Sequence, residues 1–180
     1  MRRAGWHLVA AALAALLLAP GTAQAQDGQR PELGLAWAAR VTHVVDGDSI
    51  WVRPDAGGRR VRLRLDGIDA PEICQSLGPE SRAAMQALAL DQRVQVTVWA
   101  YDRYGRAVAT VLRQSDQADV AAQLVSQGWA WSEGYRGSLG RYWREEATAR
   151  HADRGVFAER WPETPSEFRR RHGPCLTPAR

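Results

Sequence analysis

The chain has 180 residues, with 24 basic and 20 acidic side chains and a formal net charge of +4. So small an excess excludes an argument for nucleic-acid binding from net charge alone. With only 2 cysteines and 4 histidines, and no CxxC or HxxH pair, the chain lacks the ligand spacing of a zinc site. All 24 basic residues are arginine, and whether that favours phosphate binding has to be judged site by site.

The first residues have the composition of a targeting segment. Arg2 and Arg3 precede an apolar run over residues 8–18, which is too short to span a bilayer. Residues 23–25 then read Ala-Gln-Ala, the small-x-small pattern of a secretory cleavage site. We therefore expect residues 1–25 to be a signal peptide that is removed, and the protein to be exported, either to the periplasm or into the medium.

Composition divides the rest of the chain into three parts. Residues 26–36 are rich in glycine, proline and polar residues and are predicted to be a flexible lead-in. Residues 37–161 are long enough for one domain with a full core. Residues 162–180 form a tail rich in proline and arginine, without helical or strand periodicity. No second apolar run follows the first, and we expect a monomer without membrane contact or an obligate protein partner.

Three strands are predicted directly after the lead-in. Residues 37–45 and 49–53 have strand patterns on either side of an Asp-Gly-Asp turn, and Asp-Gly between two such runs is a strong hairpin signal. A second turn over residues 54–58 leads to a third strand at 59–65. Short turns permit only antiparallel pairing, so the three strands are expected to form a meander.

Helices and strands alternate in the second half of the chain. Gly78-Pro79-Glu80 favours a helix start, because proline is tolerated in the first turn and a carboxylate suits the positive end of the helix dipole. Asp119 is predicted to cap a second helix, which Gly128 ends. The expected elements are a helix at 78–90, strands at 93–100 and 106–112, a helix at 119–127, an extended piece at 129–131 and a helix at 139–153.

These elements predict a mixed β-barrel plus α fold. Five short strands, with a helix between the third and the fourth, make a small closed barrel flanked by three helices. This is the architecture of an OB-fold, whose barrel face and loops often bind nucleic acids. A doubly wound α/β sheet is disfavoured, because hairpins rather than crossover helices join the first three strands.

The stretch at residues 62–72 concentrates charge at the end of the third strand. Its arginines alternate with leucines, which is the pattern of a half-buried strand. Arg64 is followed, within a short loop, by the carboxylates of Asp69 and Glu72. A divalent metal ion together with a phosphate would use all three charges at once. A surface salt bridge at a turn is the alternative that this stretch alone leaves open.

Four pieces of the chain could bring further charged side chains to the same end of the barrel. Acidic residues suit a hard metal ion, and arginines suit phosphate. Taken singly, each of these residues also has an ordinary role in a turn or on a surface. The candidates are Asp46, Asp48, Arg64, Asp69, Glu72, Arg103, Tyr104, Arg106 and Tyr135.

Five motifs together resemble the thermonuclease, or staphylococcal-nuclease-like, family. They are Val-Asp-Gly-Asp-Ser at 45–49, Arg-Leu-Asp-Gly-Ile-Asp-Ala-Pro-Glu at 64–72, Gly-Pro-Glu-Ser at 78–81, Asp-Arg-Tyr-Gly-Arg at 102–106 and Leu-Val-Ser-Gln-Gly-Trp-Ala at 124–130. They occur in the family's order and roughly its spacing, over residues 41–161. The resemblance implies an OB-type barrel that carries a calcium-dependent phosphodiesterase acting on DNA and RNA.

The resemblance also implies which residues hold the calcium ion and activate water. Asp48 and Asp69 correspond to the ligating carboxylates, and Ala70 to a residue that supplies its backbone carbonyl. Ala70 stands where threonine is common, which keeps the carbonyl and loses a hydroxyl contact. Asp46 corresponds to an acid in the outer shell of the metal, and Glu72 to the general base or positioning group for the attacking water.

The same resemblance implies a set of residues for the substrate. Arg64 and Arg106 correspond to the pair that binds the phosphate and stabilises the transition state. Tyr104 and Tyr135 correspond to tyrosines that contact the nucleotide, and Arg103 is expected beside them.

The two cysteines, Cys74 and Cys175, are predicted to form a disulfide. An even count in an exported protein favours pairing, and a loop of about a hundred residues is worth roughly 4–5 kcal/mol in the chain-entropy model. Such a bond would clamp the tail beside the site, because Cys74 lies just after Glu72. Two unpaired thiols are the alternative.

Two other classes of function stay open on the sequence. One is a catalytically silent nucleic-acid-binding barrel, although such a protein usually lacks an acid or an arginine of the set and none is missing here. The other is an exported interaction module with Trp129, Trp131 and Trp143 as its partner patch. Packing between helices and barrel would also need the bulk of these tryptophans.

Overall fold

The computed structural model describes residues 30–134 and 137–175. The predicted signal peptide, the first part of the lead-in and Tyr135 lie outside these residues. The elements in chain order are β1 (Ala36–Val44), β2 (Ser49–Pro54), β3 (Val61–Leu65), β4 (Ile68–Asp69), α1 (Gly78–Ala89), β5 (Arg93–Tyr101), β6 (Ala107–Arg113), α2 (Val120–Ser126), β7 (Trp131–Ser132), α3 (Trp143–His151), the 3-10 helix η1 (Gly155–Ala158) and α4 (Pro165–His172).

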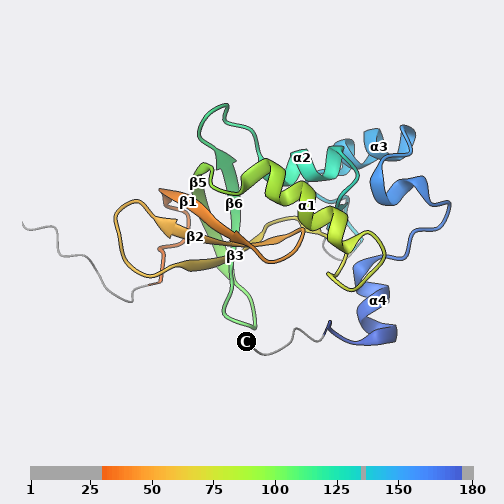
Figure 1. Cartoon of the computed structure of the whole chain (residues 1–180), viewed down its shortest axis with the longest axis horizontal. Helices are drawn as coiled ribbons and strands as arrows, with labels where there is room; N and C mark the ends of the chain where they lie inside the picture. Colours follow the sequence, from red (N-terminus) through yellow and green to blue (C-terminus); the bar gives the residue numbers. More distant parts are fainter. Residues whose placement is uncertain (1–29, 135–136, 176–180) are drawn as a thin grey trace, which may run out of the picture.

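Five strands close into a barrel in the order β1-β2-β3-β6-β5. The first three strands form the expected antiparallel meander. β3 and β6 then pair in parallel, and β5 runs antiparallel to both β1 and β6. Helices α1, α2 and α3 gather on one side of the barrel, and α4 lies below them in the view of Figure 1. The predicted OB-type barrel is confirmed.

Alternation along the strands places the core inside the barrel. Leu63 and Leu65 on β3 are fully buried, whereas Arg62 and Arg64 between and beside them point to the outer face. Met85 of α1 is also fully buried and joins the same core. The arginines of β3 are therefore held on a rigid outer surface by the packing of their apolar neighbours.

The helix count differs from the prediction, because residues 165–172 of the tail form α4 and make four α-helices among the described residues. Thr164 and Glu167 form a capping box, and Pro165 occupies the first turn. The third helix begins at Trp143 instead of residue 139. The helix α4 has no broad apolar stripe, so a search for periodicity does not detect it.

The three tryptophans of the suggested interaction patch do not form one surface. Trp131 is buried and packs edge-on against Phe157, with ring centroids 5.7 Å apart. Trp129 is partly buried against the barrel core, and Trp143 is 43 % exposed. Packing accounts for the first two. In the part of the chain that the structure describes, no helix has the length and apolarity needed to cross a membrane.

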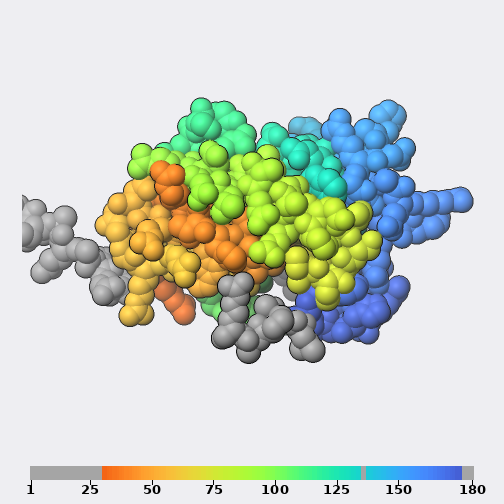
Figure 2. Space-filling view, viewed as in Figure 1, coloured from red at the N-terminus to blue at the C-terminus, as the bar shows by residue number. Residues whose placement is uncertain are grey.

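The predicted disulfide is present between Cys74 and Cys175, whose Cα atoms are 5.8 Å apart. It joins the loop before α1 to the chain just after α4. Figure 2 shows α4, in dark blue, next to the yellow-green segment that leads into α1. The tail is thus attached beside the charged end of the barrel.

Candidate active site

Arg64 is the centre of a cluster of charged side chains on the outer face of β3. Its Nη1 atom donates to Asp48 Oδ2 at 2.5 Å, and its Nη2 atom donates to Asp69 Oδ1 and to the carbonyl of Ile68, both at 3.1 Å. Only 15 % of the Arg64 side chain is exposed. The guanidinium therefore lies largely enclosed between two carboxylates, in ion pairs that are more buried than an ordinary surface salt bridge.

The turn between β1 and β2 brings Asp48 to this arginine. Ser49 Oγ donates to Asp48 Oδ1 at 2.8 Å, and the backbone N–H of Ala70 donates to Asp48 Oδ2 at 3.3 Å. A Cβ atom at Gly47 would lie 1.9 Å from Ser81 Oγ, so only glycine allows the turn to approach α1 this closely. The turn therefore fixes the carboxylate of Asp48 in place.

The turn between β5 and β6 holds the second arginine. Arg106 Nε donates to Asp102 Oδ2 at 2.6 Å, and Arg106 Nη1 donates to Ser49 Oγ at 3.4 Å. Burial would raise the pKa of Asp102, but hydrogen bonds from Arg106 and Tyr104 lower it below its ordinary value. Tyr104 is 69 % exposed, and the guanidinium carbons of Arg103 and Arg106 lie 4.8 and 5.6 Å from its ring centroid.

Glu72 has a partner that the sequence did not suggest. Arg169, on α4, donates through Nη1 to Glu72 Oε1 at 2.8 Å and to Asp69 Oδ1 at 3.2 Å. Its Nη2 atom donates to Asp69 Oδ2 at 3.0 Å. The tail of the chain thus places a third guanidinium directly on two of the predicted functional carboxylates.

The charges in the cluster shift one another's protonation. Burial, together with the neighbouring charge of Asp48, raises the pKa of Asp46 to about 7. Burial alone would lower the pKa of Arg64 and of Arg169, but the facing carboxylates outweigh it and raise both. Arg64 and Arg169 therefore stay fully charged. The carboxyl groups of Asp46 and Asp48 lie close to each other at the turn between β1 and β2, and Asp46 therefore gives up its proton less readily.

A hollow of about 610 Å³ connects these groups at the surface. Asp69 lies beside it and bonds to both Arg64 and Arg169. The structure therefore brings together the predicted residues of three of the four chain segments, while Tyr135, from the fourth, is outside the described part. The predicted residues lining the hollow are Asp46, Asp48, Arg64, Ala70, Glu72, Arg103, Tyr104 and Arg106.

Sequence reasoning missed three residues of the site. The helix that carries Arg169 could have been found from Thr164-Pro165-Ser166-Glu167, since Ser or Thr followed by an acid three residues later marks a helix start, but this pattern does not show what Arg169 contacts. Asp102, which holds Arg106, was treated only as part of a turn. Glu133 contacts Arg64 Nη2 at 3.4 Å from an exposed loop, and no local pattern points to it.

Comparisons with known proteins agree with the geometry. The sequence model of the family described as "Staphylococcal nuclease homologue" matches residues 62–159. The chain is 32 % identical over 147 residues to a micrococcal nuclease of Shigella flexneri, covering 75 % of this chain and 83 % of that protein. It is 30 % identical over 131 residues to an uncharacterized endonuclease of Haemophilus influenzae, covering 73 % and 72 %.

A plant protein is similar over a shorter part. The probable staphylococcal-like nuclease CAN2 of Oryza sativa subsp. japonica is 34 % identical over 112 residues, which are 62 % of this chain and only 30 % of that protein. The family match covers more than half of this chain, and the bacterial matches extend over most of the domain. The chain belongs to the family of staphylococcal nuclease homologues.

Proposed function

We propose that this protein is an exported, calcium-dependent nuclease that hydrolyses phosphodiester bonds in DNA and RNA. The observation that carries the proposal is the shared arginine. Arg64 bonds to Asp48, in the turn between β1 and β2, and to Asp69, in β4, which lie 21 residues apart in the chain. Arg106 reaches Ser49, the neighbour of Asp48, so a second guanidinium borders the same spot.

The donors at this spot suit a calcium ion. Asp48 and Asp69 offer carboxylate oxygens and Ala70 a backbone carbonyl, all hard oxygen ligands of the kind that calcium takes. Burial, together with the neighbouring charge of Asp48, raises the pKa of Asp46, and a cation bound at Asp48 would favour the charged form of Asp46. Among the described residues no group of three or more His, Cys, Asp and Glu side chains could enclose a metal ion. Waters and substrate oxygens would therefore complete the shell.

The arginines supply the binding of the phosphate. Arg64 and Arg106 can each direct two N–H groups at phosphate oxygens, and such charge-assisted bonds strengthen as negative charge builds in the transition state. The hydrogen bond of 2.6 Å from Arg106 Nε to Asp102 Oδ2 holds the Arg106 guanidinium in place, so the side chain needs little reorganisation when the substrate arrives. A bound calcium ion would offset the charge of the same phosphate and make its phosphorus easier to attack.

Glu72 is the group that can handle the proton of the attacking water. Its carboxylate is partly exposed at the hollow, and one of its oxygens faces Arg169. When water attacks phosphorus, its oxygen forms a P–O bond and Glu72 takes the proton that the water loses. The ester P–O bond breaks, and the leaving oxygen keeps the bonding electron pair and takes a proton from solvent. Arg169 has to release Asp69 and Glu72 before both carboxylates can act.

A second function is favoured by that same contact. With Arg169 on Asp69 and Glu72, the barrel could bind nucleic acid through Arg64 and Arg106 without cutting it. The chain would then be a catalytically silent binding module. The two functions differ in one observable, which is cleavage in the presence of calcium.

The test is a digestion of single-stranded DNA and of RNA by the mature protein, in calcium and then in excess chelator. We expect cleavage in calcium, none in chelator, and recovery when calcium is restored. Asp69→Asn removes a ligand charge at nearly constant volume and should remove the activity. Binding without cleavage in calcium would establish the silent module instead.

Export is tested separately. We propose that residues 1–25 direct the chain out of the cytoplasm, because a charged start, an apolar run and a small-residue site follow in order. Expression of the full chain should yield a mature protein that begins at Gln26 in the periplasm or the medium. A cytoplasmic protein that retains Arg2 and Arg3 would contradict it.

A further inference from the structure

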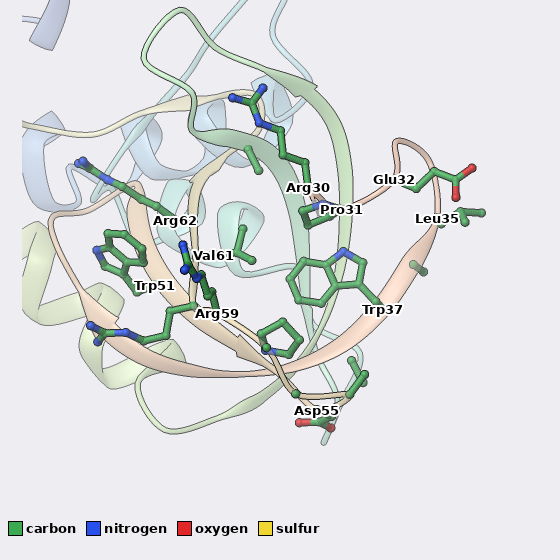
Figure 3. Close-up of a pocket in the computed structure, with 18 of the residues that line it drawn as sticks. Arg30, Pro31, Glu32, Leu35, Trp37, Trp51, Asp55, Arg59, Val61 and Arg62 are labelled. Atoms are coloured by element: carbon green, nitrogen blue, oxygen red, sulfur yellow. The ribbon is translucent and has the colours of Figure 1, made fainter. Parts of the chain in front are cut away.

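A second hollow, of about 820 Å³, opens where β3 and β6 begin. We name it the barrel-mouth groove, lined by Arg30, Trp37, Trp51, Arg60, Arg62 and Tyr101 among others. Figure 3 shows Trp51 and Arg62 on one side of it and Trp37 on the other, with Val61 between them in this view. None of these residues has a part in the site described above.

The strand register makes the groove continuous with the active site. Ser49 pairs with Arg64, and Trp51 pairs with Arg62, so the second pair lies one strand repeat, about 6.7 Å, further along the outer face. Gly105 lines the groove while its neighbours Tyr104 and Arg106 line the active site. The turn between β5 and β6 is thus a wall shared by both hollows.

The charge of the groove suits a polyanion. The described residues that line it include four arginines, at positions 30, 59, 60 and 62, and two acids. One of the acids, Asp55, is bonded to Arg93 at 2.9 Å. Among the described residues, the Nε atom of the Arg62 side chain is buried without a hydrogen-bond acceptor. Arg64, by contrast, is surrounded by carboxylates.

Aromatic rings lie between these charges. The Arg60 guanidinium lies 5.6 Å from the ring centroid of Trp51, and the Arg30 guanidinium lies 5.1 Å from that of Tyr101. Sites for single-stranded nucleic acid combine these two elements, with arginines along the backbone and flat rings on which unpaired bases stack. A duplex keeps its bases stacked on each other and would leave the rings unused.

We propose that the barrel-mouth groove binds the nucleotides next to the scissile phosphate of a single-stranded substrate. In this arrangement a base stacks on Trp51, and Arg62 binds the phosphate that follows the one held by Arg64 and Arg106. The inference rests on the proposed function, because it needs the active site to hold a phosphate. It adds that affinity increases with strand length once a single strand reaches from one hollow into the other.

The test measures equilibrium binding in chelator, so that no cleavage occurs. The probes are a labelled mononucleotide, which is too short to reach from the active site into the groove, and a labelled single-stranded oligonucleotide long enough to span both hollows. We expect Trp51→Ala with Arg62→Gln to weaken binding of the long probe about tenfold or more. Binding of the mononucleotide should stay within about twofold, since the active site is intact.

Trp161 and Arg160 provide a matched control. They form another exposed tryptophan–arginine pair, 5.8 Å apart, and line neither hollow. Trp161→Ala with Arg160→Gln should leave both affinities unchanged. The single variant Arg62→Gln, which keeps every ring, should reduce the slope of log affinity against log salt by about 0.7, the value for one phosphate contact with a single strand.

Three results would overturn the inference. They are equal loss of affinity for both probes, equal effects of the control pair and the groove pair, and competition by poly-glutamate as strong as that by the oligonucleotide. The last would assign the groove to an acidic protein segment. If the protein binds the long probe as described but never cleaves it in calcium, the proposed function fails while the groove stands. If it cleaves and the groove variant binds normally, only the groove inference fails.

Discussion

Two arginines reach Asp69 from opposite parts of the molecule. Arg64 lies on the outer face of β3, the middle strand in the order of the barrel. Its neighbours Leu63 and Leu65 are buried, and its own side chain is 15 % exposed. Arg169 belongs to α4, and its side chain is 38 % exposed. The first position is held by the barrel core and the second only by the way the tail is attached.

The attachment of α4 consists of a few local contacts. The disulfide from Cys74 to Cys175 and the hydrogen bond from Gln75 Nε2 to the carbonyl of Glu163, at 2.7 Å, connect the tail to the loop after Glu72. Within α4 only Pro165 is buried. The barrel therefore forms the rigid half of the site, and the tail forms the other half, which can be detached from the barrel.

Detaching the tail has the largest expected effect. Replacing both Cys74 and Cys175 by serine should lower the free energy of unfolding by roughly 4–5 kcal/mol, because the unfolded chain loses its cross-link. Urea unfolding of the variant and of the reduced protein should give the same value. The barrel half should remain folded and keep calcium-dependent cleavage. Unchanged stability after reduction would contradict this account of the attachment.

The next effect comes from the barrel half. Arg64→Lys keeps the positive charge between Asp48 and Asp69 but loses the planar fork that pairs with phosphate. We expect the rate of cleavage to fall about 10²–10³-fold with little change in the unfolding midpoint. Arg93→Lys, on β5 away from the active site, is the control. If the rate of cleavage by Arg64→Lys falls by less than about tenfold, Arg64 does not bind the phosphate.

A smaller effect is expected at the tail arginine. Arg169 occupies oxygens of Asp69 and Glu72 that the proposed calcium ion and attacking water would use. Arg169→Ala should therefore tighten calcium binding by about tenfold, measured by calorimetry without nucleic acid. Arg170→Ala changes the exposed neighbour on the same helix and should have no effect. Equal or weaker binding in Arg169→Ala would show that Arg169 does not compete with the ion.

The smallest effect concerns pH. The pKa of Asp102 is lower in the folded protein than in the unfolded chain, where it is about 3.9. The bond from Asp102 to Arg106 therefore stabilises the folded protein at every pH above the unfolded pKa. This contribution to the free energy of unfolding is lost as the pH falls through the lower pKa of the folded protein. The difference in unfolding midpoint between the protein and Asp102→Asn should be constant at neutral pH and shrink in acid. A difference that grows in acid would have the wrong sign.

The sequence allowed most of the barrel half to be predicted and little of the tail half. Alternation at Leu63 and Leu65, and Asp-Gly at the first hairpin, are local patterns that burial and turn geometry enforce. The parallel closure of β3 onto β6 depends on the whole barrel and has no local pattern. Arg169 was missed because α4 is positioned by the disulfide, and pairing of the cysteines alone does not say which side chain of the tail meets Asp69.

The most direct test of the central claim is a crystal structure of the mature protein grown with calcium, with the ion located by its anomalous scattering. The account predicts one ion between Asp48 and Asp69, within bonding distance of the Ala70 carbonyl, and the Arg169 guanidinium moved off Asp69. An ion bound elsewhere, or a site that stays without one at saturating calcium while Arg64 still bridges both aspartates, would contradict it.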